Sequence, residues 1–339
     1  MTESGPIGAS KPSAEDSNKL AFGTFMGVFT PSVLTILGAI MYLRFGWVVG
    51  NAGLSSTIII VLLANLVTLA TALSVSALAT SQKVGVGGAY YLVSRSLGLA
   101  MGGAVGLPLY LSQAVSITLY SYALVEALQY IWPTLPLQIT AAGLVIVITL
   151  GAARSTSFAL KSQAFILIAV ALSIASLLWG ADWSAPISVA DGTYNDSSVN
   201  GFWDVFAVFF PAVTGILTGL SLSGDLRDPE KSLPLGTISA VLVGFIIYIF
   251  VPLALAHHGD VAALNDNPLV WLSVAAVPML IFPGLISAIL SSALGSVLAA
   301  PRTLQALSDD TILPARLGRL SDGQPKIATW VSGIVALFA

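Results

Sequence analysis

Long apolar runs separated by short polar breaks constrain this chain more than any other feature. From Ala21 onward, the runs approach or exceed the roughly 20 residues that an α-helix needs to cross a bilayer. They are continuous, whereas a membrane β-barrel alternates polar and apolar residues along each strand. Only 9% of the residues are charged and the mean hydropathy is +0.91, against about a quarter charged in a soluble domain. The sequence therefore predicts an all-α polytopic membrane protein.

Eight runs are long enough to be full spans, and a ninth begins near Ile327 and reaches Ala339. We therefore expect an incomplete core with eight full spans and the start of a ninth. Residues 1–20 are polar and lack a signal-peptide pattern, so we expect a disordered cytoplasmic N-terminus followed by a membrane-spanning core over 21–339. The spans are predicted at about 25–49, 55–80, 100–131, 136–153, 158–181, 204–223, 235–257 and 272–300.

The basic residues predict how the chain is oriented. With the N-terminus in the cytoplasm, all but one of the 13 Lys and Arg residues fall on cytoplasmic ends, and the exception is Arg44. This distribution predicts a multi-pass protein of the plasma membrane with a cytoplasmic N-terminus. The 16 acidic residues outnumber the basic ones, which leaves no basic surface for a nucleic acid. The chain has no cysteine, which excludes disulfides and thiolate metal sites.

Two spans share a motif. Span one contains FTPSVLTILGAI (29–40) and span six contains FFPAVTGILTGL (209–220), each with an aromatic residue, a proline and a later Ile-Leu pair. An interior proline removes a helical hydrogen bond, and the small residues nearby tolerate unwinding. The copies are five spans apart, an odd offset, so the second runs inverted, as in inverted-repeat secondary transporters. A plain kink is the simpler alternative. An unwound pair offers N–H groups to an anion and carbonyls to a cation.

Four stretches resemble the cation-chloride cotransporters (solute carrier family 12) of the amino acid–polyamine–organocation superfamily. They are the first span at 23–54, GVGGAYYLVSRSLG at 85–98, SGDLRDPEKSLPLGT at 223–237 and SSALGSVLAAPRTLQALSDD at 291–310. The resemblance implies a LeuT-type fold of five plus five inverted spans. It places the first repeat at about 21–181 and the second, incomplete here, at about 204–339.

The resemblance also implies the binding residues. A potassium site would use Thr35, Ile36, Tyr120, Pro211 and Thr214, although Thr35 stands where the family has an asparagine. A sodium site would use Leu34, Leu37, Ala288, Ser291 and Ser292, and its serine pair is typical of sodium-coupled members. Two chloride sites would use the backbone of Gly38, Ala39 and Ile40 and that of Gly215, Ile216 and Leu217. Arg44 and Glu126 would form the salt bridge of an outer gate.

The function that these features imply is a secondary active symporter coupling Na⁺ and/or K⁺ to Cl⁻ by alternating access. No ATP-binding motif or catalytic constellation is present, so we expect neither an enzyme nor a cofactor. The expected partners are the transported inorganic ions and the lipid bilayer, with no nucleic acid and with homodimer formation left open. The alternatives are an amino acid or polyamine permease of the same fold, a channel, and a non-transporting family member.

Three remaining motifs give no evidence for a further binding or catalytic site. His257 and His258 have no third ligand nearby in sequence, so we expect a wet loop rather than a metal site. GVGG at 85–88 lacks the ending of a phosphate-binding loop and is interpreted as a turn between spans two and three. Asn195 begins a glycosylation sequon in a predicted outer loop, relevant only to a eukaryotic source.

Overall fold

A computed structural model shows a bundle of helices. It describes residues 22–81, 85–154, 156–187, 189, 201–221, 226–257, 261–321 and 323–339. Within these ranges the only strand-like pairings are two isolated bridges, Phe22 with Leu226 and Ser321 with Gln324. The N-terminus expected to be disordered, the Asn195 sequon and His258 lie outside the described residues.

The first half of the chain begins with an interrupted helix. Its segments are a π-helical turn η1 (Phe25–Phe29), α1 (Thr30–Ile36), α2 (Ala39–Leu43) and the start of α3 (Phe45–Ser81). Gly53 has φ 74° and ψ 167°, a conformation that glycine adopts readily, so it separates span one from span two inside α3. The rest of this half comprises α4 (Ala89–Leu97), α5 (Leu99–Gln129), α6 (Leu137–Arg154) and α7 (Thr156–Gly180).

The second half repeats this plan with a second interrupted helix. Span six consists of α8 (Phe202–Phe209), a 3₁₀ turn η2 (Phe210–Val213) and α9 (Ile216–Ser221). It is followed by α10 (Pro229–Ala256), the short helices α11 (Val261–Asp266) and α12 (Trp271–Val274), and a 3₁₀ turn η4 (Pro278–Leu280). The last two helices are α13 (Ile281–Asp309) and α14 (Lys326–Phe338).

The eight predicted spans are confirmed, because eight described helical stretches are long and apolar enough to cross a membrane. The limits predicted for the eighth are wrong at both ends. Residues 272–277 belong to α12 and a linker, and the helix continues past residue 300 to Asp309. The extension contains polar side chains that the protein itself buries, including Thr303 and Ser308, so hydropathy alone ends the span too early.

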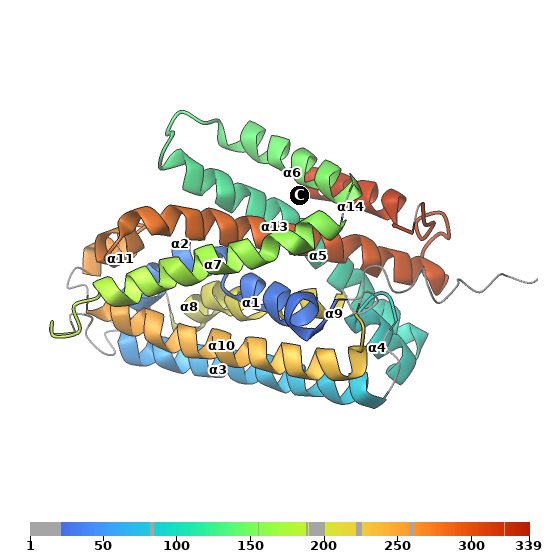
Figure 1. Cartoon of the computed structure of the whole chain (residues 1–339), viewed down its shortest axis with the longest axis horizontal. Coiled ribbons are helices and arrows are strands. Elements are labelled where there is room, and N and C mark those ends of the chain that lie inside the picture. Colours follow the sequence, from blue (N-terminus) through green and yellow to red (C-terminus); the bar gives the residue numbers. More distant parts are fainter. Residues whose placement is uncertain are drawn as a thin grey trace, which may run out of the picture.

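The first span lies at the centre of the bundle. Figure 1 shows α1 surrounded by α7, α9 and α10, with α13 above it in this view. In its most apolar stretch 78% of the residues are buried in the protein, against 28% for α5 and for α6. The outer helices instead present apolar side chains such as Ile139 and Phe165 to the surroundings, as lipid-facing helices do. The interrupted helices are therefore held inside the protein.

Candidate functional site

Span one is interrupted immediately after Ile36. Leu37 leaves the helix with φ −78° and ψ 41°, Gly38 is extended, and α2 begins at Ala39. Helix ends leave backbone N–H and C=O groups without intrahelical partners, and ligands are among the groups that satisfy them. The residues predicted to bind ions from span one, over 34–40, therefore lie on the two sides of a real gap in the helix.

Span six is interrupted at Thr214 and Gly215. The α-helix α8 tightens into the 3₁₀ turn η2, and the backbone is not in regular helix at Thr214 and Gly215. The helix begins again as α9. The Thr214 hydroxyl donates a 2.8 Å hydrogen bond to the carbonyl of Pro211. In span one the Thr35 hydroxyl does the same to the carbonyl of Pro31, at 2.7 Å. Each threonine oxygen thus keeps its lone pairs for another partner.

The two gaps touch each other. A Cβ atom placed on Gly215 would lie 2.7 Å from the Ile36 amide nitrogen and 2.8 Å from both the carbonyl carbon and the Cβ of Thr35. Such distances are shorter than any ordinary contact, so only a glycine permits this approach. The predicted potassium residues Thr35 and Ile36 therefore lie against the predicted chloride residue Gly215, while Pro211 and Thr214 are exposed.

The predicted sodium residues are buried between span one and α13. Leu34, Leu37, Ala288, Ser291 and Ser292 are all at most 2% exposed. The Ser292 hydroxyl donates to the carbonyl of Ala288 at 3.0 Å, and a Cβ on Gly38 would lie 2.9 Å from its oxygen. The Ser291 hydroxyl has no hydrogen-bond partner among the described residues. Its oxygen therefore has lone pairs available to contact a cation.

Tyr120 connects the two predicted cation sites. Its side chain, from α5, lies beside the hydroxyl of Ser292. The structure therefore brings a predicted potassium residue together with a predicted sodium residue, where α5 packs against α13. Among the described residues no hydrogen bond links Tyr120 to Pro211 or Thr214, which bond to each other.

Two hydroxyls that sequence reasoning missed also contact the gaps. Tyr248 of α10 donates a short hydrogen bond to the carbonyl of Ile36, and its oxygen is 3.3 Å from the carbonyl of Ala212. The Thr68 hydroxyl of α3 lies 3.2 Å from the carbonyl of Val213. Tyr248 stands alone as a hydrogen-bonding side chain in the run GFIIYIF, and a buried tyrosine hydroxyl usually finds a partner. That signal could have identified it.

The residues predicted to form an outer gate lie next to each other. Arg44 ends α2 and Glu126 is near the end of α5, with 3.4 Å between the Nη2 and Oε1 atoms. Their side chains are 45% and 41% exposed, so water screens the pair.

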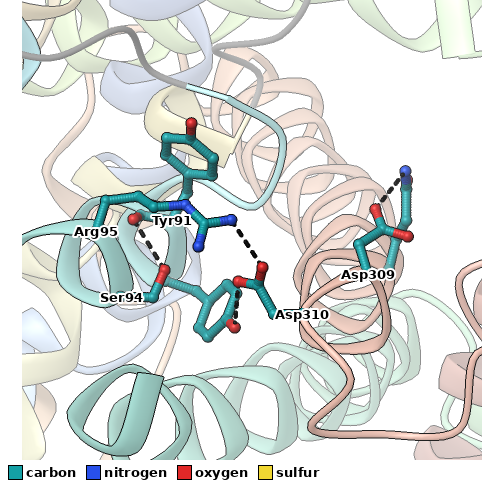
Figure 2. A network of polar contacts seen from close by, with 7 residues as sticks. Tyr91, Ser94, Arg95, Asp309 and Asp310 are labelled. Atoms are coloured by element: carbon teal, nitrogen blue, oxygen red, sulfur yellow. Dashed lines mark hydrogen bonds and ion pairs between the residues drawn. The ribbon is translucent and has the colours of Figure 1, made fainter. Parts of the chain in front are cut away.

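At the opposite end of the bundle, α4 is fastened to the end of α13 (Figure 2). Asp310 accepts a hydrogen bond from Arg95 and another from the Tyr90 hydroxyl, each 2.7 Å long. Burial, and then the neighbouring Asp310, raise the pKa of Tyr90, so this hydroxyl keeps its proton as a donor. The Tyr91 ring lies 5.1 Å from the Arg95 guanidinium carbon.

The GVGG stretch forms the turn that leads into α4, as its interpretation predicted. A Cβ on Gly88 would lie 3.0 Å from the Cα of Ser221 at the end of α9, so this turn packs against the second interrupted helix. His257 contacts the carbonyl of Ala185 at 2.6 Å and the ring of Trp183. The described residues contain no group of three metal-ligating side chains.

Comparison with known proteins gives two findings. The sequence matches the amino acid permease family over residues 27–339. Among curated proteins it is 32% identical to mouse (Mus musculus) solute carrier family 12 member 2 over 89% of this chain and 30% of that protein. It is 32% identical to mouse member 1 over 86% of this chain and 32% of that relative. It is also 32% identical to mouse member 8 over 92% of this chain and 46% of that relative. The chain thus spans between about a third and a half of the length of these relatives.

Proposed function

Because the chain belongs to the amino acid permease family and its predicted resemblance to solute carrier family 12 is confirmed, we propose that it is a secondary active symporter that couples Na⁺ and/or K⁺ to Cl⁻. The ions would bind at the gaps of spans one and six. The protein would lie in the plasma membrane with its N-terminus in the cytoplasm, and Arg44 and Glu126 would close the outer mouth.

One observation carries the proposal: two interrupted helices meet at Gly215 and Thr35, and the buried Ser292 hydroxyl of α13 lies against the first gap at Gly38. An isolated charge is costly at membrane depth. The predicted cation residues carry hydroxyls and carbonyls but no fixed charge. A cation and an anion held on neighbouring segments neutralise each other, so binding both together is favoured over binding either alone.

The same fold can carry an amino acid, and the geometry of the first gap argues against that substrate. Ile36 and Leu37, which border the gap, are bulky and only 2% exposed. An amino acid needs a pocket there, whereas a bare ion needs only a few oxygen atoms. The gap in span one therefore fits monovalent ions better.

Ion flux in liposomes tests the proposal. We expect the full-length protein, reconstituted in liposomes, to take up rubidium or sodium when chloride is present and to lose most of that uptake when gluconate replaces chloride. Empty liposomes are the control. Uptake that is indifferent to chloride would contradict the proposed symport. Amino acid uptake under the same conditions would favour the permease.

Removing the charge of either Arg44 or Glu126 should have a measurable but modest effect on the rate of transport. A half-exposed ion pair contributes about 0.2–1 kcal/mol, so we expect Arg44→Gln or Glu126→Gln to slow transport about two- to fivefold. The exchange of both charges, Arg44→Glu with Glu126→Arg, should restore part of the rate. The measurement is the initial rate of ion uptake at low and high ionic strength, because salt weakens an exposed pair. Equal rates in the wild type and both single variants would count against a gate.

A further inference from the structure

Tyr248 contacts the backbone of both interrupted helices. It belongs to α10, which has no gap near this residue, and its side chain is fully buried. Its hydroxyl donates to the carbonyl of Ile36, the last residue of α1, and lies 3.3 Å from the carbonyl of Ala212 in η2. One side chain thus reaches the edge of the gap in span one and the turn that precedes the gap in span six.

The ring of Tyr248 is fixed by aromatic side chains of the same two spans. Phe45, at the start of α3, lies edge-on to it with ring centroids 5.5 Å apart. Phe209, the last residue of α8, lies at the same centroid distance and at a steep angle. The two phenylalanines also pack against each other at 5.2 Å. Aromatic pairs of this geometry contribute stability beyond their buried area, so the hydroxyl is held at the two carbonyls.

A second hydroxyl completes the connection. Thr68 of α3 reaches the Val213 carbonyl, which follows the Ala212 carbonyl that Tyr248 approaches. Thr68 also lies within reach of the Ala64 carbonyl of its own helix. Spans one, two, six and seven are thereby joined at the level of the gaps by side chains that carry no charge.

We propose that Tyr248 is a positioning residue that holds the gaps of spans one and six together as one unit, so that their backbone groups bind ions in a fixed relative geometry. The inference deepens the proposed ion symport and rests on it. Tyr248 would not need to touch an ion, because it acts through the Ile36 carbonyl and the turn at Ala212. Removing its hydroxyl would leave the buried Ile36 carbonyl without this donor and would let the two gaps separate.

The decisive variant is Tyr248→Phe, which keeps the ring and its packing and removes only the hydroxyl. Tyr110→Phe is the matched control, since Tyr110 is also buried but packs with Tyr90, Ala300 and Leu307 away from the gaps. A second pair tests the other hydroxyl: Thr68→Val removes it and Thr68→Ser retains it. All variants are made in the full-length protein and reconstituted in liposomes.

Two readouts test the inference. Losing one buried hydrogen bond should weaken the apparent cation affinity about five- to tenfold in Tyr248→Phe, with a smaller change in maximal rate. Hydrogen exchange of backbone amides should accelerate by a similar factor over residues 36–40 and 212–216, because these segments open locally. Tyr110→Phe should change neither quantity. Thr68→Val should resemble Tyr248→Phe, and Thr68→Ser should resemble the wild type.

The outcomes separate this inference from the proposed symport. If wild-type uptake ignores chloride, the symport fails, while the exchange measurement still tests Tyr248. If Tyr248→Phe leaves exchange at both segments at the wild-type rate, the inference is overturned whatever the substrate. A lower maximal rate with unchanged affinity and unchanged exchange would also overturn it, since that pattern reports only a general loss of stability.

Discussion

Replacing Gly215 with alanine should reduce ion uptake about 100-fold or more. The added Cβ would lie 2.7 Å from the amide nitrogen of Ile36 and 2.8 Å from the carbonyl carbon of Thr35. These are backbone atoms, so no rotamer change relieves the contact, and the two gaps must move apart. Forcing extra atoms into a packed site typically costs about 1–3 kcal/mol. Here the strain falls on the groups proposed to bind the ions, so the binding of both the cation and the anion would be weakened.

The matched control is Gly143→Ala in α6, where an added Cβ meets no described atom within 4 Å. Alanine is the better helix former, so this variant should fold at least as well as the wild type. Uptake is measured per amount of protein that elutes as a single peak in detergent, which separates transport from folding. Uptake by Gly215→Ala within a fewfold of the wild type would show that the close approach of the gaps is dispensable.

The second large effect is expected at the predicted sodium site. In Ser292→Ala we expect the sodium concentration for half-maximal uptake to rise about 10- to 100-fold, because hydrogen-bond-like contacts to a charged group are worth about 1.5–3 kcal/mol. The Ser292 hydroxyl already donates its proton to the Ala288 carbonyl, so its oxygen is oriented to accept a cation. Ser291→Ala should act in the same direction.

Ser308→Ala is the control for this experiment. Ser308 lies on the same helix, is 2% exposed and donates to the Leu304 carbonyl at 3.0 Å, the same local bond that Ser292 makes. It lies about four turns further along α13, away from the first gap. The measurement is the sodium dependence of uptake at fixed chloride. Equal half-saturation in Ser292→Ala and Ser308→Ala would refute the sodium site.

The interrupted helices were the most predictable part of the site, although the proline was given the wrong role. Pro31 lies in the first turn of α1, directly after the π-helical turn η1, and the helix runs on for five more residues. The interruption comes at Leu37 and Gly38. In span six it comes at Thr214 and Gly215, three residues after Pro211. The shared motif identified the two spans that the structure shows to be interrupted, and small residues after each proline mark the gaps.

Contacts between distant residues that the family resemblance did not imply were beyond sequence reasoning. Periodicity and hydropathy describe one segment at a time, whereas Tyr248 meets Ile36 across 212 residues of chain. The extension of α13 to Asp309 was missed for a related reason. A polar residue such as Thr303 suggests the end of a span when the sequence is considered alone. In the structure its hydroxyl donates to the side-chain oxygen of Gln113 on the neighbouring helix α5, at 2.9 Å. Tertiary contacts determine both features.

The burial of the first span has a consequence for how the protein is made. This helix is synthesised before the helices that enclose it, which include α10 and α13 and begin roughly 200 and 250 residues later. At about 5–20 residues per second, that is a delay of roughly 10 to 50 s. During that time a helix containing Thr30, Ser32 and Thr35 has neither its partners nor a fully apolar face to offer to lipid. The order of synthesis thus opposes the order of packing, because the most buried span is made before the helices that bury it.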